Sequence, residues 1–87
     1  MNDFPPLRIL QDTVFPFDAR GIAKRFRHAA IFGALDVLKD GETMRFINDH
    51  EPVPLLNQLA LRYGARVSVH YRQCNDGHVV IDFIKEE

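Results

Sequence analysis

The sequence has 87 residues and a formal net charge of −1, with 11 lysines and arginines against 12 aspartates and glutamates. This length accommodates one domain, because a second independent hydrophobic core would not fit. Hydrophobic residues make up 46% and charged residues 26%, an ordinary composition for a folded domain that excludes a disordered tail or a fibrous repeat. The nearly balanced charge argues against a dedicated nucleic-acid-binding protein, which carries an excess of lysine and arginine.

The sequence also limits the compartment and the cysteine chemistry. No apolar stretch approaches the roughly 20 residues that a membrane-spanning helix needs, so we expect no membrane association. The first residues lack a basic region followed by an apolar stretch, and we therefore expect no secretory signal and a cytoplasmic protein. The single cysteine, Cys74, excludes an internal disulfide and a cysteine-based zinc site. It stands beside a turn without a CxxC partner, and we expect an inert thiol.

In chain order, the first predicted feature is an extended arm over residues 1–12, since Pro5-Pro6 neither opens a strand nor continues a helix. A single domain is predicted over residues 13–87. Its first strand is predicted at 13–18, which is rich in β-branched and aromatic residues. Pro16 lacks an N–H group, so this strand must have a free edge or an interruption at that point.

Helices and strands alternate through the rest of the chain. A helix is predicted over about 26–38, where apolar residues continue one stripe at helical spacing. A second helix begins near Pro52 and Pro54 and ends at Gly64. Further strands are predicted where apolar and polar residues alternate, at 42–48, 66–72 and 78–84. Asn75-Asp76-Gly77 joins the last two strands as a hairpin turn.

The element order β-α-β-α-β-β predicts an α+β two-layer sandwich, a four-stranded mixed sheet with two helices packed on one face. Each passage from a strand through a helix implies a right-handed crossover, which places the helices on the same or neighbouring faces of the sheet. The other, open face of the sheet would be partly solvated. It would carry the cationic and imidazole side chains Arg45, Arg66, His70 and Arg72.

Polar side chains gather where the carboxyl ends of parallel strands and the starts of the helices are expected to meet. Ligands collect at this position in open α/β sheets, because free backbone N–H groups point there. The candidate ligand-binding residues, which we call the rim, are Asp18, Arg20, Arg27, His28, Asn48, Asp49, His50 and Glu51. Such a group is able to ligate a divalent metal ion, to act as an acid–base pair or to hold an anion.

A metal ion at the rim would be held by His28, His50 and Glu51, since imidazole and carboxylate suit a divalent cation. Structural roles compete with this hypothesis, because Asp49 can cap the second helix and Asn48 can close a turn. No GxGxxG, Walker-type, GxSxG or HExxH motif is present, so nucleotide binding and the best-known hydrolase mechanisms have no support. The identity of a cofactor stays open, with a divalent metal ion as one candidate.

Several short segments follow a common pattern, namely FDAR at 17–20, RH at 27–28, IFGALD at 31–36, GE at 41–42 and NDHEPVPL at 48–55. The pattern resembles a bacterial domain-of-unknown-function family, number 2249, over nearly the whole chain, from about Val14 to Ile84. The chain departs from that family at Ala29, where the family usually has proline. It departs again at Glu51, which replaces an aspartate by a longer carboxylate.

This family in turn resembles the sulfur-carrier fold of TusA and SirA, a two-layer sandwich with the same element order. The resemblance implies that fold without its persulfide chemistry, because the carriers' reactive cysteine corresponds to about Lys24 and no cysteine lies near it. Members of the family also occur joined to hemerythrin-like domains and among genes for nitrogen-oxide and anaerobic metabolism. The resemblance therefore implies a redox or metal setting and a hemerythrin-like or other redox protein as a partner.

From these observations we expect a small accessory or binding domain rather than an enzyme. Its site would be the rim, and its ligand a metal ion, an anion or a protein partner. One alternative is a small enzyme that uses His28 and His50 as acid and base. A second alternative is a protein-interaction module that uses the open sheet face. We expect no nucleic-acid partner.

Overall fold

The computed structural model describes residues 13–86, and the arm expected over 1–12 lies outside them. The strands are β1 (Val14–Asp18), β2 (Thr43–Asn48), β3 (Val67–Asn75) and β4 (His78–Lys85). The α-helices are α2 (Lys24–Val37) and α3 (Val53–Tyr63), and the short 3-10 helices are η1 (Ala19–Gly21) and η2 (Gly64–Arg66). This order confirms the predicted β-α-β-α-β-β succession.

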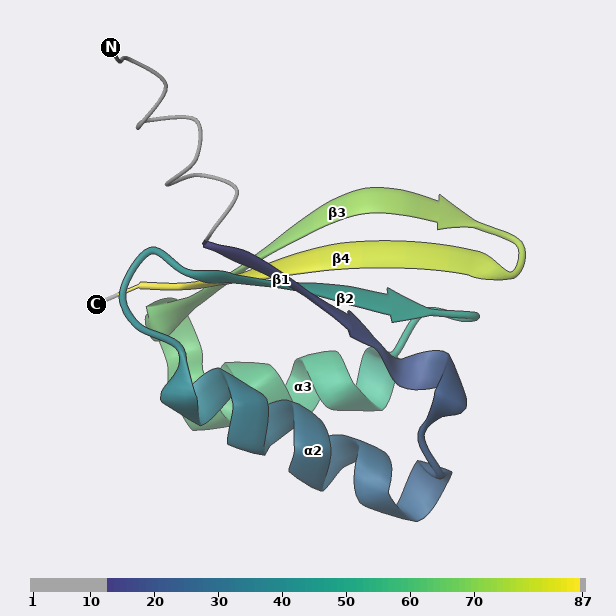
Figure 1. Cartoon of the computed structure of the whole chain (residues 1–87), viewed down its shortest axis with the longest axis horizontal. Coiled ribbons are helices and arrows are strands. Elements are labelled where there is room, and N and C mark those ends of the chain that lie inside the picture. The colour runs from purple at the N-terminus through teal and green to yellow at the C-terminus, as the bar shows by residue number, and fades with distance from the viewer. Residues whose placement is uncertain (1–12, 87) are drawn as a thin grey trace, which may run out of the picture.

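The four strands form one mixed sheet in the order β1-β2-β4-β3. β1 and β2 run parallel, whereas β4 runs antiparallel to both of its neighbours. The two α-helices lie side by side on one face of this sheet (Figure 1). Pro16 lies in β1, which is an edge strand, as a proline within a strand requires. The predicted α+β sandwich is therefore confirmed.

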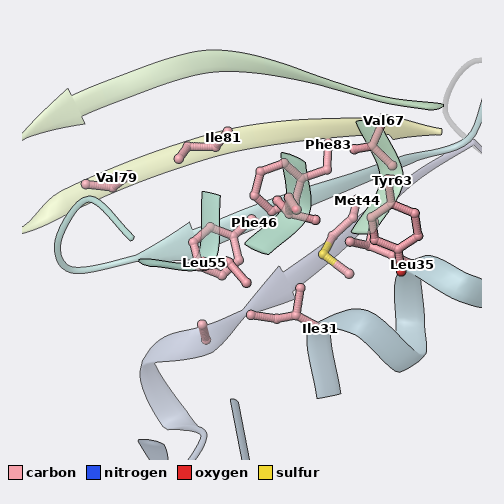
Figure 2. Packing of buried hydrophobic residues seen from close by; sticks show 12 residues of the cluster. Ile31, Leu35, Met44, Phe46, Leu55, Tyr63, Val67, Val79, Ile81 and Phe83 are labelled. Carbon is pink, nitrogen blue, oxygen red and sulfur yellow. The ribbon is translucent and has the colours of Figure 1, made fainter. Parts of the chain in front are cut away.

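The hydrophobic core lies between the helices and the sheet face that they cover (Figure 2). Its buried side chains are Ala19, Ile31, Leu35, Met44, Phe46, Leu55, Leu59, Tyr63, Val67, Val79, Ile81 and Phe83. The rings of Phe46 and Phe83, on the adjacent strands β2 and β4, have centroids 5.4 Å apart. Every second residue of these strands faces the helices, because side chains alternate between the two faces of a sheet.

The starts of the two α-helices determine which backbone N–H groups are free near the rim. α3 begins at Val53 with Pro54 in its first turn and ends before Gly64, whose φ of 57° lies in the left-handed region that favours glycine. α2 begins at Lys24, two residues earlier than predicted. Its N-cap residue is Ala23, which has no side-chain oxygen to accept from the free N–H groups of the first turn.

The open sheet face differs from the prediction at Arg66. This residue lies in η2 rather than in a strand, because β3 begins at Val67. Its guanidinium donates to the carbonyl oxygens of Tyr63 at 3.3 Å and Arg62 at 3.1 Å, so it belongs to the end of α3. Within residues 13–86, neither helix is long and apolar enough to cross a membrane.

Arg45 lies on the open face as predicted, and it makes a two-bond ion pair with the buried carboxylate of Asp82 on β4. The Arg45 Nε atom donates to Oδ1 at 2.9 Å and the Nη2 atom donates to Oδ2 at 3.1 Å. Arg72 contributes a weaker contact of 3.5 Å to Oδ2. Asp82 is only 5% exposed, so these cations neutralise a charge that burial would otherwise make unfavourable.

Candidate functional site

The rim forms at the end of the sheet where β1 and β2 finish and where α2 and α3 begin (Figure 1). The two strands are parallel, so their carboxyl ends meet at one edge of the molecule. Each strand is followed by a short connection and then by a helix that runs back along the sheet. Chain direction therefore brings segments that are distant in sequence to one end of the fold.

A cavity of about 130 Å³ lies at this end of the molecule, and we call it the helix-start cavity. Its polar lining consists of Lys24, Arg27, His28, Asn48 and His50. The remaining lining is apolar and includes the core residues Ile31, Phe46 and Leu55. The predicted rim residues Arg27, His28, Asn48 and His50 thus share one cavity.

The start of α2 gives the helix-start cavity a positive character. Lys24 and Arg27 both line it, and the first turn of α2 contains no acidic residue. The Arg27 Nη2 atom donates to the carbonyl oxygen of Ile22 at 2.9 Å, which holds the guanidinium in place. The Nε atom of the same side chain is buried and has no hydrogen-bond partner within residues 13–86. The first turn of α2 has no side chain that caps its backbone N–H groups, and these groups add partial positive charge beside the two cations.

Asn48 has an unpaired hydrogen-bond acceptor among the described residues, whereas Arg27 has an unpaired donor. It is 1% exposed and occupies the last position of β2. Its Nδ2 atom donates to the carbonyl oxygen of His50 at 3.0 Å, so Asn48 closes the turn after β2. A carbonyl oxygen only accepts, and this bond therefore fixes which end of the amide is the oxygen. The Oδ1 atom is buried and has no donor in the described part of the chain.

Asp49 and His50 form a local pair, with the Asp49 Oδ1 atom 2.6 Å from the His50 Nδ1 atom. The hydrogen bond from His50 lowers the pKa of Asp49, and the charge of Arg27 acts in the same direction. Asp49 does not cap α3, because the N-cap residue is Pro52 and no side chain accepts there. The capping role considered for Asp49 is therefore wrong.

Glu51 lines a second and more open hollow, together with Asp49, His50 and Cys74. Its Oε2 atom accepts a hydrogen bond from the Tyr71 hydroxyl at 2.5 Å, and this bond raises the pKa of Tyr71 to about 12. The long β3–β4 hairpin brings Cys74 to this hollow, where it is exposed. Sequence spacing gave no sign that Cys74 would share a surface with His50.

Asp18 and Arg20 line neither the helix-start cavity nor the second hollow. The Arg20 side chain donates to both carboxylate oxygens of Asp18, at 2.9 and 2.8 Å, and its backbone N–H donates at 3.0 Å. These bonds lower the pKa of Asp18 to about 2. The pair caps η1, so these two rim residues are engaged in shaping the connection to α2.

The three predicted metal ligands do not line one common cavity. His28 and His50 line the helix-start cavity, whereas His50 and Glu51 line the second hollow. Across the residues that the structure describes, no three or more His, Cys, Asp or Glu side chains are grouped in a way that would hold a metal ion. Lys24 is not among the predicted rim residues, because the apolar helical pattern begins after it.

The fold and the cavity define a small α+β sandwich domain with a cavity of mixed polar and apolar lining between its two helix starts. Residues 16–85 match the family described as an uncharacterized conserved protein, DUF2249, and the chain belongs to this family. The match confirms the family resemblance seen in the sequence. No curated protein and no solved structure was found to match the chain. The likeness to the sulfur-carrier fold of TusA and SirA therefore stays a prediction.

Proposed function

We propose that this protein is a binding domain that takes a small anion into the helix-start cavity. The observation that carries the proposal is the buried Nε atom of Arg27, a charged donor that has no acceptor in the described range 13–86. A buried donor that lacks a partner destabilises the protein, and a hydrogen bond from a charged group is among the stronger ones. An anion oxygen in the cavity would supply the missing acceptor.

The surrounding charges favour the same kind of ligand. Lys24 adds a second cation to the cavity lining, and the free N–H groups at the start of α2 favour negative charge. The charge of Arg27 helps to lower the pKa of Asp49, but the Oδ1 atom of that carboxylate is hydrogen-bonded to His50. The cavity lining therefore has an excess of positive charge, which a bound anion would neutralise.

The size of the cavity limits the ligand to a few heavy atoms. Sites for drug-sized ligands and cofactors usually measure roughly 300–1,000 Å³. The helix-start cavity has about 130 Å³, which suits an inorganic oxyanion or a very small carboxylate. The resemblance to proteins found beside redox and hemerythrin-like domains extends the proposal to an accessory role, in which this domain binds the anion and a partner performs the chemistry.

Calorimetric titration of the full chain with inorganic phosphate, sulfate, bicarbonate and nitrate tests this proposal. At least one of these anions should bind, and Lys24→Gln and Arg27→Gln should each weaken that binding by about tenfold, since hydrogen bonds to charged groups are lost. Arg25→Gln is the matched control. It removes the same charge from the first turn of α2, but Arg25 lies over the ring of Phe26 and does not line the cavity.

The control separates a site from a general attraction of anions to positive charge. Arg25→Gln should leave the affinity within about twofold of that of the original protein, because exposed charges contribute little. Equal weakening by all three variants would show diffuse attraction rather than binding in the cavity. Absence of binding by every one of these anions would contradict the proposed function.

A further inference from the structure

Two residues that line the helix-start cavity each have a buried side-chain atom without a hydrogen-bond partner within residues 13–86, and the two atoms are of opposite kind. Among the residues that the structure describes, the Nε atom of Arg27 is a donor without an acceptor, and the Oδ1 atom of Asn48 is an acceptor without a donor. Both residues line the cavity, and both atoms are buried. A ligand that pairs with both must offer an acceptor oxygen and also a hydrogen that it can donate.

The acceptor role of Asn48 is fixed by its surroundings. Its Nδ2 atom is committed to the carbonyl oxygen of His50 at 3.0 Å, so the amide cannot rotate to present a donor without losing that bond. The side chain is 1% exposed, so bulk water does not supply Oδ1 with a donor. A group that brings only lone pairs to this oxygen would be repelled by it and would leave it unpaired.

We infer that the helix-start cavity selects oxyanions that retain a proton, and that Asn48 is the residue that detects this proton. The inference rests on the proposed function and names the class of ligand that the site takes. Phosphate near neutral pH and bicarbonate both carry an O–H group beside negatively charged oxygens. Sulfate and nitrate have similar shapes, but they offer only acceptors and leave Oδ1 unsatisfied.

Two matched pairs of anions test the inference on the unmodified protein. Phosphate and sulfate are both tetrahedral, and at about pH 8 phosphate resembles sulfate in charge but keeps one proton. Bicarbonate and nitrate are both planar and carry one negative charge. In the pair whose shape fits the cavity, the protonated anion should bind at least about tenfold more tightly, because the proton-free anion leaves a buried acceptor unpaired.

The possible results separate the inference from the function on which it rests. Equal affinity within each pair, or a preference for the proton-free anion, would overturn the inference while anion binding itself stands. Failure of all the anions to bind would overturn the proposed function and the inference together. These outcomes come from the unmodified protein and do not depend on whether a variant folds.

Asn48→Leu assigns the selectivity to one side chain. Leucine has a similar volume and removes the acceptor together with the Nδ2 bond to His50, and the preference for the protonated anion should fall by about tenfold, towards parity. Asn57→Leu is the control, because Asn57 is exposed on α3 and does not line the cavity. A folded Asn48→Leu protein that keeps the full preference would show that another group detects the proton.

Discussion

The side-chain amide of Asn48 donates to the carbonyl oxygen of His50, 3.0 Å away, across the turn that follows β2. This short-range bond orients the amide and leaves its buried oxygen without a donor within residues 13–86. The same turn places His50 in the lining of the helix-start cavity. Local backbone geometry over residues 48–50 therefore sets both the shape of the site and its hydrogen-bonding character.

Leu35→Ala tests whether α2 packs on the sheet as described. Leu35 is fully buried in the core, and removing its side chain leaves a cavity. The free energy of unfolding, measured by denaturant titration, should fall by about 2–5 kcal/mol. Leu61→Ala is the control, because Leu61 is 89% exposed on α3, and it should change stability by less than about 0.5 kcal/mol. Similar small effects of both substitutions would contradict the packing.

Acid should destabilise the protein because it protonates Asp36, a carboxylate on α2 that accepts hydrogen bonds from α3. The Tyr63 hydroxyl donates to Asp36 Oδ1 at 2.6 Å and Arg62 donates to Oδ2 at 2.8 Å, which lowers the pKa of Asp36 below its ordinary value of 3.8. Because the folded-state pKa is lowered, this contribution to stability is present above pH 3.8 and is lost as the pH falls through the folded-state value.

The Asp36→Asn variant should therefore show a smaller drop in thermal midpoint between neutral pH and the acid range below pH 3.8 than the original protein. Asp40→Asn provides the comparison, since Asp40 is exposed and makes no ion pair or side-chain hydrogen bond within residues 13–86. It should leave the pH dependence unchanged. If both variants respond to acid like the original protein, the bond between the helices contributes no pH-dependent stability.

Tyr71 should ionise at a higher pH than an ordinary tyrosine. Its bond to Glu51 raises its pKa to about 12 from an ordinary value of 10.0. Glu51→Gln removes the negative charge and should move the tyrosinate transition back towards 10.0, as followed by ultraviolet absorbance. The measurement is made in a Tyr63→Phe background, where Tyr71 is the one remaining tyrosine of the chain. An unchanged transition in the glutamine variant would show that the bond is not formed in solution.

Cys74 should be accessible to reagents and unnecessary for anion binding. It is exposed at the second hollow and does not line the helix-start cavity. Iodoacetamide should therefore alkylate the folded protein without prior unfolding, as mass spectrometry would show. Cys74→Ser should leave the calorimetric affinity for the bound anion within about twofold, since the site contacts lie elsewhere. A large loss of affinity in this variant would move the site to the second hollow.

The strands and the core were predictable because they depend on periodicity. Alternation over 43–48 places Met44 and Phe46 on the helix-covered face, and the structure buries both. The start of α2 was missed because Lys24-Arg25 precedes the apolar stripe and Ala23 gives no capping signal. These first residues do not pack in the core, so hydrophobic spacing carries no information about them.

The candidate site was predictable only as a region. The parallel strands bring the rim together, but the direction of each side chain in the loop at 49–51 depends on backbone angles that no residue pattern reveals. Glu51 consequently pairs with Tyr71, while its neighbour His50 lines the helix-start cavity. One sequence signal was available for Asn48, because the alternation of β2 places this polar residue on the same face as Met44 and Phe46.

The most direct test of the account is an NMR titration that locates the bound anion on the chain. Backbone amide signals of the 87-residue chain are followed as inorganic phosphate is added, and bicarbonate is used if phosphate does not bind. The largest shifts should occur at residues 24–28 and 48–50, and Arg27→Gln should reduce them at the same anion concentration. Shifts centred on Arg45 and Arg72 of the open sheet face, or unchanged shifts in the Arg27→Gln variant, would contradict the account.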